Sequence, residues 1–439
     1  MSERGLGRSF RPLRQRDFAL LWSSSLVSTV GTWMQTVAVG ALVTERTGKA
    51  TWTALVAVAA FLPVGLLAPV GGAIADRTDR RRWLAFGTLL ETALAGILTA
   101  LSATGRASPG VVTFVVFLGG CMAALLAPVQ QSLVPDLVPH DDVLAASSLG
   151  MAQYNLGRVV GPALAAVVIA VGSFTLAFAV NAVSFLAVVI AVLLIRLPPR
   201  RPAPATGLIR SIQEGARVAW SEPGCRAAIV LIAVAAFLVS PFIALIPAKA
   251  AGLVDGEKAV AAATGVLTTA QGVGAVIGAL LVAPVAARFG RRRVVVAALT
   301  GASLALCAYA AAPTTVSAVA ALSVVGMLYV SVLTGLSTVV LLRSPAEHRA
   351  RATSLFFVAL GVIYPLGALV QGAVADRIGL AATTTAGALA LIGVVAGIRA
   401  ARPGFLDALE DTPAEPAIAG EALGTAAQGG PTADSAPSD

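Results

Sequence analysis

The chain is dominated by long apolar runs, and these runs decide what it can fold into. A helix needs about 20 apolar residues to cross the hydrocarbon core of a bilayer. Twelve such runs follow one another, at residues 18–43, 52–75, 83–103, 110–134, 144–171, 174–196, 226–250, 262–286, 294–312, 315–342, 353–375 and 380–400. The pattern predicts an all-α membrane protein with twelve transmembrane helices. Several runs contain Pro or Gly, which membrane helices tolerate when neighbouring groups satisfy the freed backbone.

The overall composition excludes a water-soluble fold. Hydrophobic residues make up 57% of the chain and charged residues only 12%, whereas a soluble domain carries about 25% charged residues. The 43 glycines indicate close helix packing, because helices in lipid associate through small residues.

The basic residues predict how the chain is oriented. If residue 1 is cytoplasmic, Arg clusters before Phe18 and within 77–82, 196–226, 288–293 and 343–351 all lie on the cytoplasmic side. The opposite side carries only Arg46, Lys49, Arg106, Lys249, Lys258 and Arg377. We expect the protein to lie in the inner membrane. The positive-inside rule then predicts that both of its termini are cytoplasmic. The net charge of +9 therefore marks a membrane surface and not a nucleic-acid partner.

The chain reads as two similar halves. Charged residues follow the second run at Asp76–Arg82 and the eighth run at Ala287–Arg293, and such parallel repeats are common in transporters. The expected organisation is a basic N-terminus (1–17), a six-helix bundle (18–196), a linker (197–225), a second bundle (226–401) and a tail (402–439). The tail is rich in Ala, Pro, Gly and acids, and we expect it to be disordered and cytoplasmic.

Two motifs resemble those of the major facilitator superfamily, and the resemblance extends over nearly all of residues 10–400. Gly72–Arg82 looks like the signature between the second and third helices, with Asp79 in place of the usual Gly. Gly157-Arg158-Val159-Val160-Gly161-Pro162 looks like the antiporter signature, although Ala165-Ala166 replaces its closing Gly pair. Together with Pro135–Pro139 and Ala145–Ser148, these segments are most similar to the enterobactin exporter and the macrolide and multidrug efflux group.

The resemblance implies a transporter whose two pseudo-symmetric six-helix bundles alternate between inward-open and outward-open states. It assigns a conformational gate to Gly72, Asp76, Arg77, Arg80 and Arg81, and an antiporter motif to Gly157, Arg158, Gly161 and Pro162. The Asp76 carboxylate is expected to dock on the start of the eleventh run near Arg349 and Arg351, because a helix N-terminus carries a partial positive charge. Alternatively, Asp76 caps its own loop and balances Arg77.

Arg158 and Glu91 are the charged residues that lie well inside apolar runs. Charges at this depth are costly and face a cavity or a partner. We hypothesise that the two pair, or that Glu91 takes up a proton in a proton-coupling path. The alternatives are a purely structural ion pair and a Glu91 kept neutral in a packed interface. The fourth run lacks the Arg found in many drug–proton antiporters of the superfamily.

By the same resemblance, the first, fourth, seventh and tenth runs line a central cavity. Their polar and aromatic residues are the candidate substrate-binding residues: Trp33, Gln35, Gln130, Gln131, Phe237, Ser240, Tyr329 and Thr334. Any one of them could instead form an interhelical hydrogen bond. Gln271 and Asn155 are further candidates.

Together these features predict proton-driven export of a small amphiphile, such as a siderophore, a secondary metabolite or a drug. The sequence shows no phosphate-binding Gly-rich loop, no metal-ligand spacing and no nucleophile beside a base, so we expect no enzyme activity, no cofactor and no metal. The expected partners are the substrate, protons and the lipid bilayer, with the protein as a monomer by analogy. An importer on the same fold and a non-transporting membrane scaffold are the alternatives.

Overall fold

The computed structural model describes residues 9–196, 217, 220–344 and 349–410, without the side chains of residues 75–77, 350, 351 and 354. Among the described residues, eleven helices are long and apolar enough to cross a membrane. The prediction of an all-α membrane protein is confirmed, and the helix count is consistent with twelve spans. Most of the predicted linker and most of the predicted tail lie outside the described residues.

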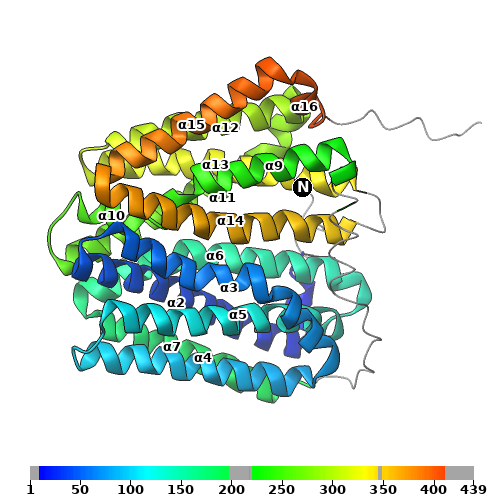
Figure 1. Ribbon diagram of the computed structural model, residues 1–439. Coiled ribbons are helices and arrows are strands. Elements are labelled where there is room, and N and C mark those ends of the chain that lie inside the picture. The colour runs from blue at the N-terminus through cyan, green and yellow to red at the C-terminus, as the bar shows by residue number, and fades with distance from the viewer. Residues whose placement is uncertain (1–8, 197–216, 218–219, 345–348, 411–439) are drawn as a thin grey trace, which may run out of the picture.

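The first half contains six long helices that lie together in the lower part of Figure 1. Their ends lie within a few residues of the predicted ends, because bilayer thickness fixes the length of an apolar run. After the short 3-10 helix η1 (Arg11–Arg14), they are α2 (Arg16–Thr47), α3 (Ala50–Arg77), α4 (Arg80–Ala103), α5 (Pro109–Leu137), α6 (Val143–Val171) and α7 (Phe174–Leu194), with η2 (His140–Asp142) before α6.

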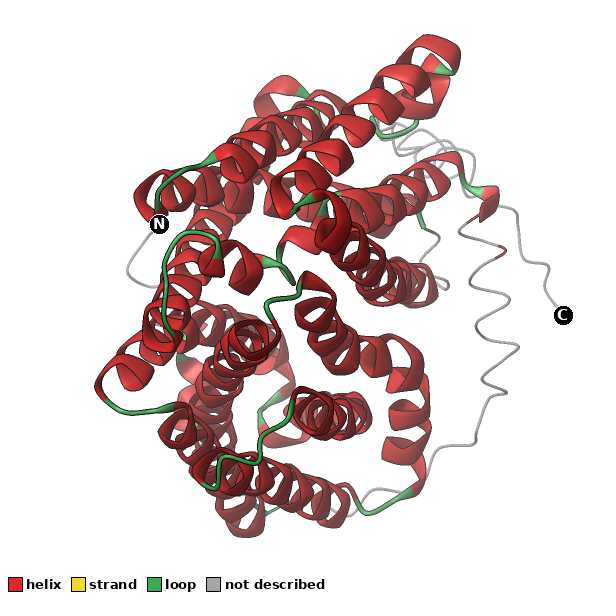
Figure 2. Cartoon of the chain, turned by 60° about the vertical axis from the view of Figure 1, so that its left-hand side comes forward, coloured by secondary structure: helices red, strands yellow, loops and turns green. Residues whose placement is uncertain are grey.

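The second half lies above the first in Figure 1. It contains α9 (Pro223–Leu238), η3 (Ser240–Phe242), α10 (Ile246–Ala251), α11 (Glu257–Phe289), α12 (Arg291–Ala311), α13 (Thr315–Arg343), α14 (Arg349–Ile378), α15 (Leu380–Ala401) and α16 (Pro403–Asp407). Figure 2 shows the helices of the whole chain turned closer to end-on, with short loops joining many of them. The halves meet where α3 packs on α14 and α6 packs on α11.

Local signals set several helix ends. The Asp79 side chain accepts hydrogen bonds from the backbone N–H groups of Arg81 and Arg82 and so caps α4. Thr314 and Ser317 form a capping box at the start of α13, which satisfies backbone donors that the first turn leaves unpaired. Gly48 ends α2 with a positive φ of 62°, a conformation that glycine adopts without steric cost.

The predicted seventh span is broken and not continuous. Helix α9 ends at Leu238, and η3 and α10 continue the path toward the outer end of the bundle. Pro241 and Pro247 lie at the starts of these two short helices, and proline cannot donate a backbone hydrogen bond. The Gln371 amide of α14 donates to the carbonyls of Phe237 and Leu238 at 2.8 and 2.9 Å. This side chain therefore satisfies groups that the break leaves free.

The bundle has two ends, which we name by their elements. The inner end carries η1 and α16, at the right in Figure 1; the outer end carries α10 and the turn between α2 and α3, at the left. The Arg clusters at 80–82 and 291–293 begin α4 and α12 at the inner end, so the positive-inside rule predicts that this end faces the cytoplasm.

The predicted tail begins later than residue 402. Residues 403–407 form α16, and Leu406 and Leu409 are buried against the second half. Asp407 forms an ion pair with Arg292 of α12. Leu406 and Leu409 bury enough apolar surface for this short segment to pack. The prediction of a disordered tail was based on the average composition of residues 402–439, which does not reveal two such leucines.

Candidate functional site

The gate residues predicted at the start of α4 hold the first half together. Arg80 is buried and forms an ion pair with Asp136 of α5 at 2.5 Å, and it also donates to the Ser132 carbonyl at 2.7 Å. Arg81 donates to the carbonyls of Val192 and Leu193 at the end of α7. Both arginines therefore fix α4 against helices of their own half. Because the Arg80 charge is buried, removing Asp136 would leave it uncompensated.

The remaining gate residues lie at the inner end of α3. Among the described residues, a Cβ added to Gly72 would meet no atom within 4 Å. The side chains of Asp76, Arg77 and Arg351 lie outside the described part of the chain, and Arg349 is exposed. The docking of Asp76 on α14 therefore stays a prediction.

The glycines of the predicted antiporter motif make close helix contacts. A Cβ on Gly157 would lie 2.5 Å from Thr29 of α2, and one on Gly161 would lie 2.6 Å from Trp33. On the side of α6 that faces the second half, a Cβ on Gly265 of α11 would lie 2.5 Å from the carbonyl oxygen of Pro162. Small residues permit such close backbone approach in membranes. The motif thus lets α6 pack closely against α2 on one side and against α11 of the second half on the opposite side.

Arg158 lies at this boundary between the halves. Its guanidinium donates to the Gln271 side-chain oxygen of α11 at 2.9 Å and lies 5.8 Å above the Trp33 ring. Tyr154, one turn before Arg158, packs edge-on against Trp33 with ring centroids 6.0 Å apart. We call Trp33, Tyr154, Arg158 and Gln271 the seam cluster.

The seam cluster contains a donor without a partner. Gln271 is 1% exposed, and its amide nitrogen makes no hydrogen bond within the described residues. A buried unpaired donor costs about 1–3 kcal/mol. The cluster therefore presents positive charge and a free donor between aromatic rings.

Glu91 is not the partner of Arg158. It lies on the face of α4 that carries the buried residues Thr88 and Ala95, and the described residues give it no ion pair or hydrogen bond. Arg158 is bound instead to a neutral amide of the opposite half. The hypothesised ion pair is therefore absent, and a protonation role for Glu91 stays a prediction.

The predicted substrate-binding residues do not line one common site. Trp33 belongs to the seam cluster, whereas the side chains of Gln131 and Phe237 are exposed. Others hold helices together, because Asn181 donates to Gln35 at 2.8 Å and Gln130 donates to Ser25 at 2.7 Å.

The two candidates from the second half that meet each other are Ser240 and Tyr329. Their hydroxyl groups lie 2.7 Å apart, and the Tyr329 ring packs edge-on against Phe242. Ser240 is fully buried, so it braces the broken seventh span. Thr334 is half-buried. Asn155, a further candidate, donates to the Met151 carbonyl of its own helix.

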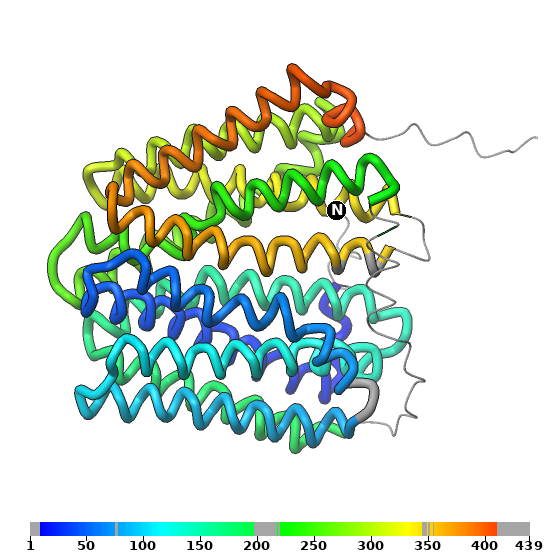
Figure 3. The backbone as a smooth tube through the Cα atoms, in the orientation of Figure 1, coloured from blue at the N-terminus to red at the C-terminus, as the bar shows by residue number. Residues whose placement is uncertain are grey.

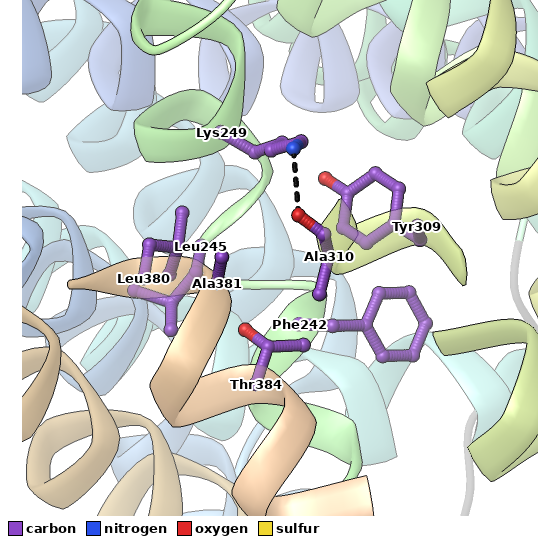
Figure 4. A pocket seen from close by; sticks show the side chains of 8 residues that line it. All are labelled: Phe242, Leu245, Lys249, Tyr309, Ala310, Leu380, Ala381 and Thr384. Carbon is purple, nitrogen blue, oxygen red and sulfur yellow. Dashed lines mark hydrogen bonds between the residues drawn. The ribbon is translucent and has the colours of Figure 1, made fainter. Parts of the chain in front are cut away.

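A second polar feature lies at the outer end of the second half, in the view of Figure 4. The Lys249 ammonium donates to the carbonyls of Ala310 and Ala312 at 3.0 and 2.9 Å. These carbonyls end α12, where the helix dipole favours a cation. The adjoining cavity, next to Tyr309 and Thr384, has about 10 Å³, which is room for about one water molecule. Lys249 is thus a helix cap, and this cavity is too small for a substrate.

Sequence reasoning missed Tyr154 and the pairing of Gln271 with Arg158. Tyr154 could have been found from its spacing, since four residues on a helix place it on the same face as Arg158. The pairing joins helices from different halves, and no local pattern indicates it. Among the described residues, no group of three His, Cys, Asp or Glu side chains could hold a metal ion.

Comparison with known proteins agrees with this architecture. A family model described as transmembrane secretion effector matches residues 7–423. The chain is 24% identical to macrolide efflux protein A of Streptococcus pyogenes over 52% of this chain, and the match spans 58% of the length of that relative. It is 27% identical to the multidrug efflux pump Tap of Mycobacterium tuberculosis, over 86% of this chain and 92% of the pump.

Solved structures share the fold. A bacterial homologue of the human lysosomal transporter Spinster, in an inward-facing and occupied conformation, superposes with a TM-score of 0.73 at 16% identity, covering 92% of this chain and 100% of that one. A point mutant of the nucleoside transporter NupG gives a TM-score of 0.72 at 14% identity, covering 88% of this chain and 99% of that one. At these identities the likeness concerns the fold alone.

Proposed function

The chain belongs to the transmembrane secretion effector family of major facilitator transporters, and on that premise we propose that it exports a small amphiphile from the cytoplasm by proton antiport. Family membership makes it a multi-pass membrane transporter for a small molecule and not an enzyme. The proposal adds direction, coupling, substrate class and an inner-membrane location with both termini cytoplasmic. The efflux relatives support the direction of transport.

The seam cluster supports the substrate class. Arg158 supplies a fixed positive charge, and Gln271 supplies an amide donor with no partner in the described residues. Both groups offer hydrogen-bond donors to a ligand, so they select carboxylate, carbonyl or other acceptor-rich groups. The rings of Trp33 and Tyr154 offer an apolar wall. We therefore propose a neutral or anionic amphiphile, such as a siderophore or another acceptor-rich secondary metabolite or drug.

The experiment compares three fluorescent amphiphiles with the same ring system and an anionic, neutral or cationic group. Accumulation is measured in cells that lack their own exporters, with and without the protein and a protonophore. We expect the protein to lower accumulation of the anionic and neutral probes, and the protonophore to reverse this. Uptake of the same probes into inside-out vesicles fixes the direction. Export that favours the cation would contradict the substrate class, and movement only into cells would contradict export.

Glu91 is the proposed proton site, because it is an acid inside a span with no ion pair among the described residues. Glu91→Gln keeps the shape of the side chain but cannot release a proton. We expect export by this variant to fall to the level of protonophore-treated wild type, with exchange of substrate in the absence of a proton gradient preserved. Glu45→Gln is the matched control, since Glu45 is an exposed acid at the outer end of α2. Normal proton-driven export by Glu91→Gln would exclude Glu91 from coupling.

A further inference from the structure

The two halves differ in the charges at corresponding helix ends. In the first half, Arg80 at the start of α4 forms an ion pair with Asp136 near the end of α5. The corresponding helices of the second half are α12, which begins with Arg291–Arg293, and α13, which ends with Arg343. Bases therefore occur at both positions. Because like charges repel, an acid from elsewhere in the chain is needed to hold these two helix ends together.

The start of α12 receives its acids from the end of the described chain. Helix α4 is capped by its own Asp79, whereas Gly290 precedes α12 and has no side chain that could cap it. The Glu410 carboxylate lies 2.6 Å from the position of a Cβ on Gly290, and it forms an ion pair with Arg292 at 3.4 Å. Asp407 also forms an ion pair with Arg292. Carboxylates are stabilised here, because a helix N-terminus carries a partial positive charge.

The same segment also reaches the end of α13 and the start of α9. The Arg343 guanidinium donates to the Ala408 carbonyl at 3.2 Å and forms an ion pair with Glu222 at 3.4 Å. Glu222 precedes α9 and caps it, because its carboxylate accepts from the backbone N–H of Cys225 at 2.5 Å. A Cβ on Gly224 would lie 2.8 Å from the Ala408 oxygen, so the two backbones approach closely. The inner ends of three helices therefore meet on one short segment.

Apolar side chains anchor this segment to the bundle. Leu406 and Leu409 are buried, and Phe405 packs against the same hydrophobic core. Figure 3 shows α16 (red) folding back from the end of α15 (orange) at the inner end. Burial of these side chains supplies most of the attachment energy, since exposed ion pairs contribute little. The ion pairs instead decide which helix ends the segment joins, because charges set specificity and register.

We propose that residues 403–410 form a C-terminal clasp that joins the inner ends of α9, α12 and α13 into one unit. The clasp does for the second half what the Arg80–Asp136 ion pair does for the first, with acids supplied from outside the repeated helices. Salt loosens it, because Arg292 and the two acids of the clasp are partly exposed and salt screens charges at a surface. This goes beyond the proposed function, since it holds for any substrate and either direction of transport.

The test is amide hydrogen exchange of the full-length protein in lipid nanodiscs, at low and at high salt. Exchange is followed at residues 405–410, at 294–297 in α12 and at 340–344 at the end of α13, with the start of α4 as internal reference. The double variant Asp407→Asn/Glu410→Gln removes both charges with little change of shape. We expect about tenfold faster exchange at all three places, with the reference unchanged. High salt is expected to bring the wild type toward the variant and to leave the variant unchanged.

Matched variants separate the clasp from a general effect of charge. Asp141→Asn/Asp255→Asn removes two exposed acids that form no ion pair among the described residues, and it is expected to leave exchange unchanged. Glu222→Gln keeps an acceptor for the start of α9 but loses the charge that faces Arg343, so exchange should rise at the end of α13 and not at the start of α12. Free exchange of residues 405–410 in the wild type would overturn the proposal. Protected ends of α12 and α13 in the double variant would overturn it too, because the segment would then be a passive attachment.

Discussion

Replacing Arg158 with alanine is expected to lower export of the anionic probe about 10- to 100-fold, the range for losing a charge-assisted hydrogen bond of about 1.5–3 kcal/mol. Arg158 brings a positive charge to the contact between α6 and α11, where it donates to Gln271 and lies over the Trp33 ring. Without it, an anion entering the membrane-embedded site has no compensating charge, and Gln271 loses its partner.

Arg158→Lys separates charge from shape. Lysine keeps the charge but loses the planar guanidinium that binds the amide while it lies over the indole ring. We expect export of the anionic probe to fall about fivefold with lysine, between wild type and alanine. The measurement is the initial rate of probe efflux as a function of probe concentration, for the anionic and the neutral probe.

Gln271→Ala and the double variant Arg158→Ala/Gln271→Ala complete a double-mutant cycle, which isolates the contribution of the Arg158–Gln271 interaction to export. If Arg158 and Gln271 act as one unit, the double variant is expected to lose little more than Arg158→Ala alone. Arg106→Ala is the control, because Arg106 is an exposed basic residue in the loop between α4 and α5. Equal losses for the anionic and the cationic probe in Arg158→Ala would show that Arg158 only supports the fold.

The spans could be predicted from the sequence because one physical constraint decides them. A helix in lipid must satisfy its backbone within itself and must match the bilayer thickness, so α5 and α13 end within a few residues of the predicted positions. The break in the seventh span was not predicted. Pro241 and Pro247 are visible in the sequence, but the amide that makes the break tolerable belongs to Gln371, which lies far away along the chain.

Residues of the site could be predicted only where a single residue differs in character from the sequence around it, such as a charge within an apolar run. Arg158 could be singled out because a charge within an apolar run is costly and requires a cavity or a partner. One hypothesis paired it with Glu91, whereas in the structure Arg158 donates to the neutral side chain of Gln271. The contact between Asp376 and the start of α3 could not be predicted, because it depends on the register of two helices from different halves.

The packing of α11 on α13 gives the largest expected effect on stability. A Cβ on Gly274 would lie 1.9 Å from the Ser323 carbonyl oxygen, and one on Gly278 would lie 2.1 Å from that of Met327. Even alanine therefore cannot be accommodated unless the helices move apart. We expect Gly274→Ala and Gly278→Ala each to destabilise the protein by about 3 kcal/mol, at the upper end of overpacking costs. Thermal unfolding in detergent, followed by size-exclusion chromatography, measures this.

Gly393 provides the matched control for these substitutions. It lies within α15, and a Cβ there would meet no atom within 4 Å, so Gly393→Ala is expected to leave the unfolding temperature unchanged or slightly raised, since alanine favours helix. If Gly278→Ala is as stable as Gly393→Ala, the close contact between α11 and α13 does not exist in the membrane protein.

Gly326 connects this helix contact to the seam cluster. On α13, a Cβ at Gly326 would lie 2.1 Å from the backbone oxygen of Gln271, the residue whose side chain binds Arg158. Gly326→Ala is therefore expected to push the Gln271 backbone away from α13 and to disturb the amide that meets the guanidinium. The variant should lose export more strongly than its loss of stability accounts for, when rates are compared at equal amounts of folded protein. Export in proportion to folded protein would mean that Gln271 adjusts without loss, and that the seam cluster does not depend on the packing of α11 against α13.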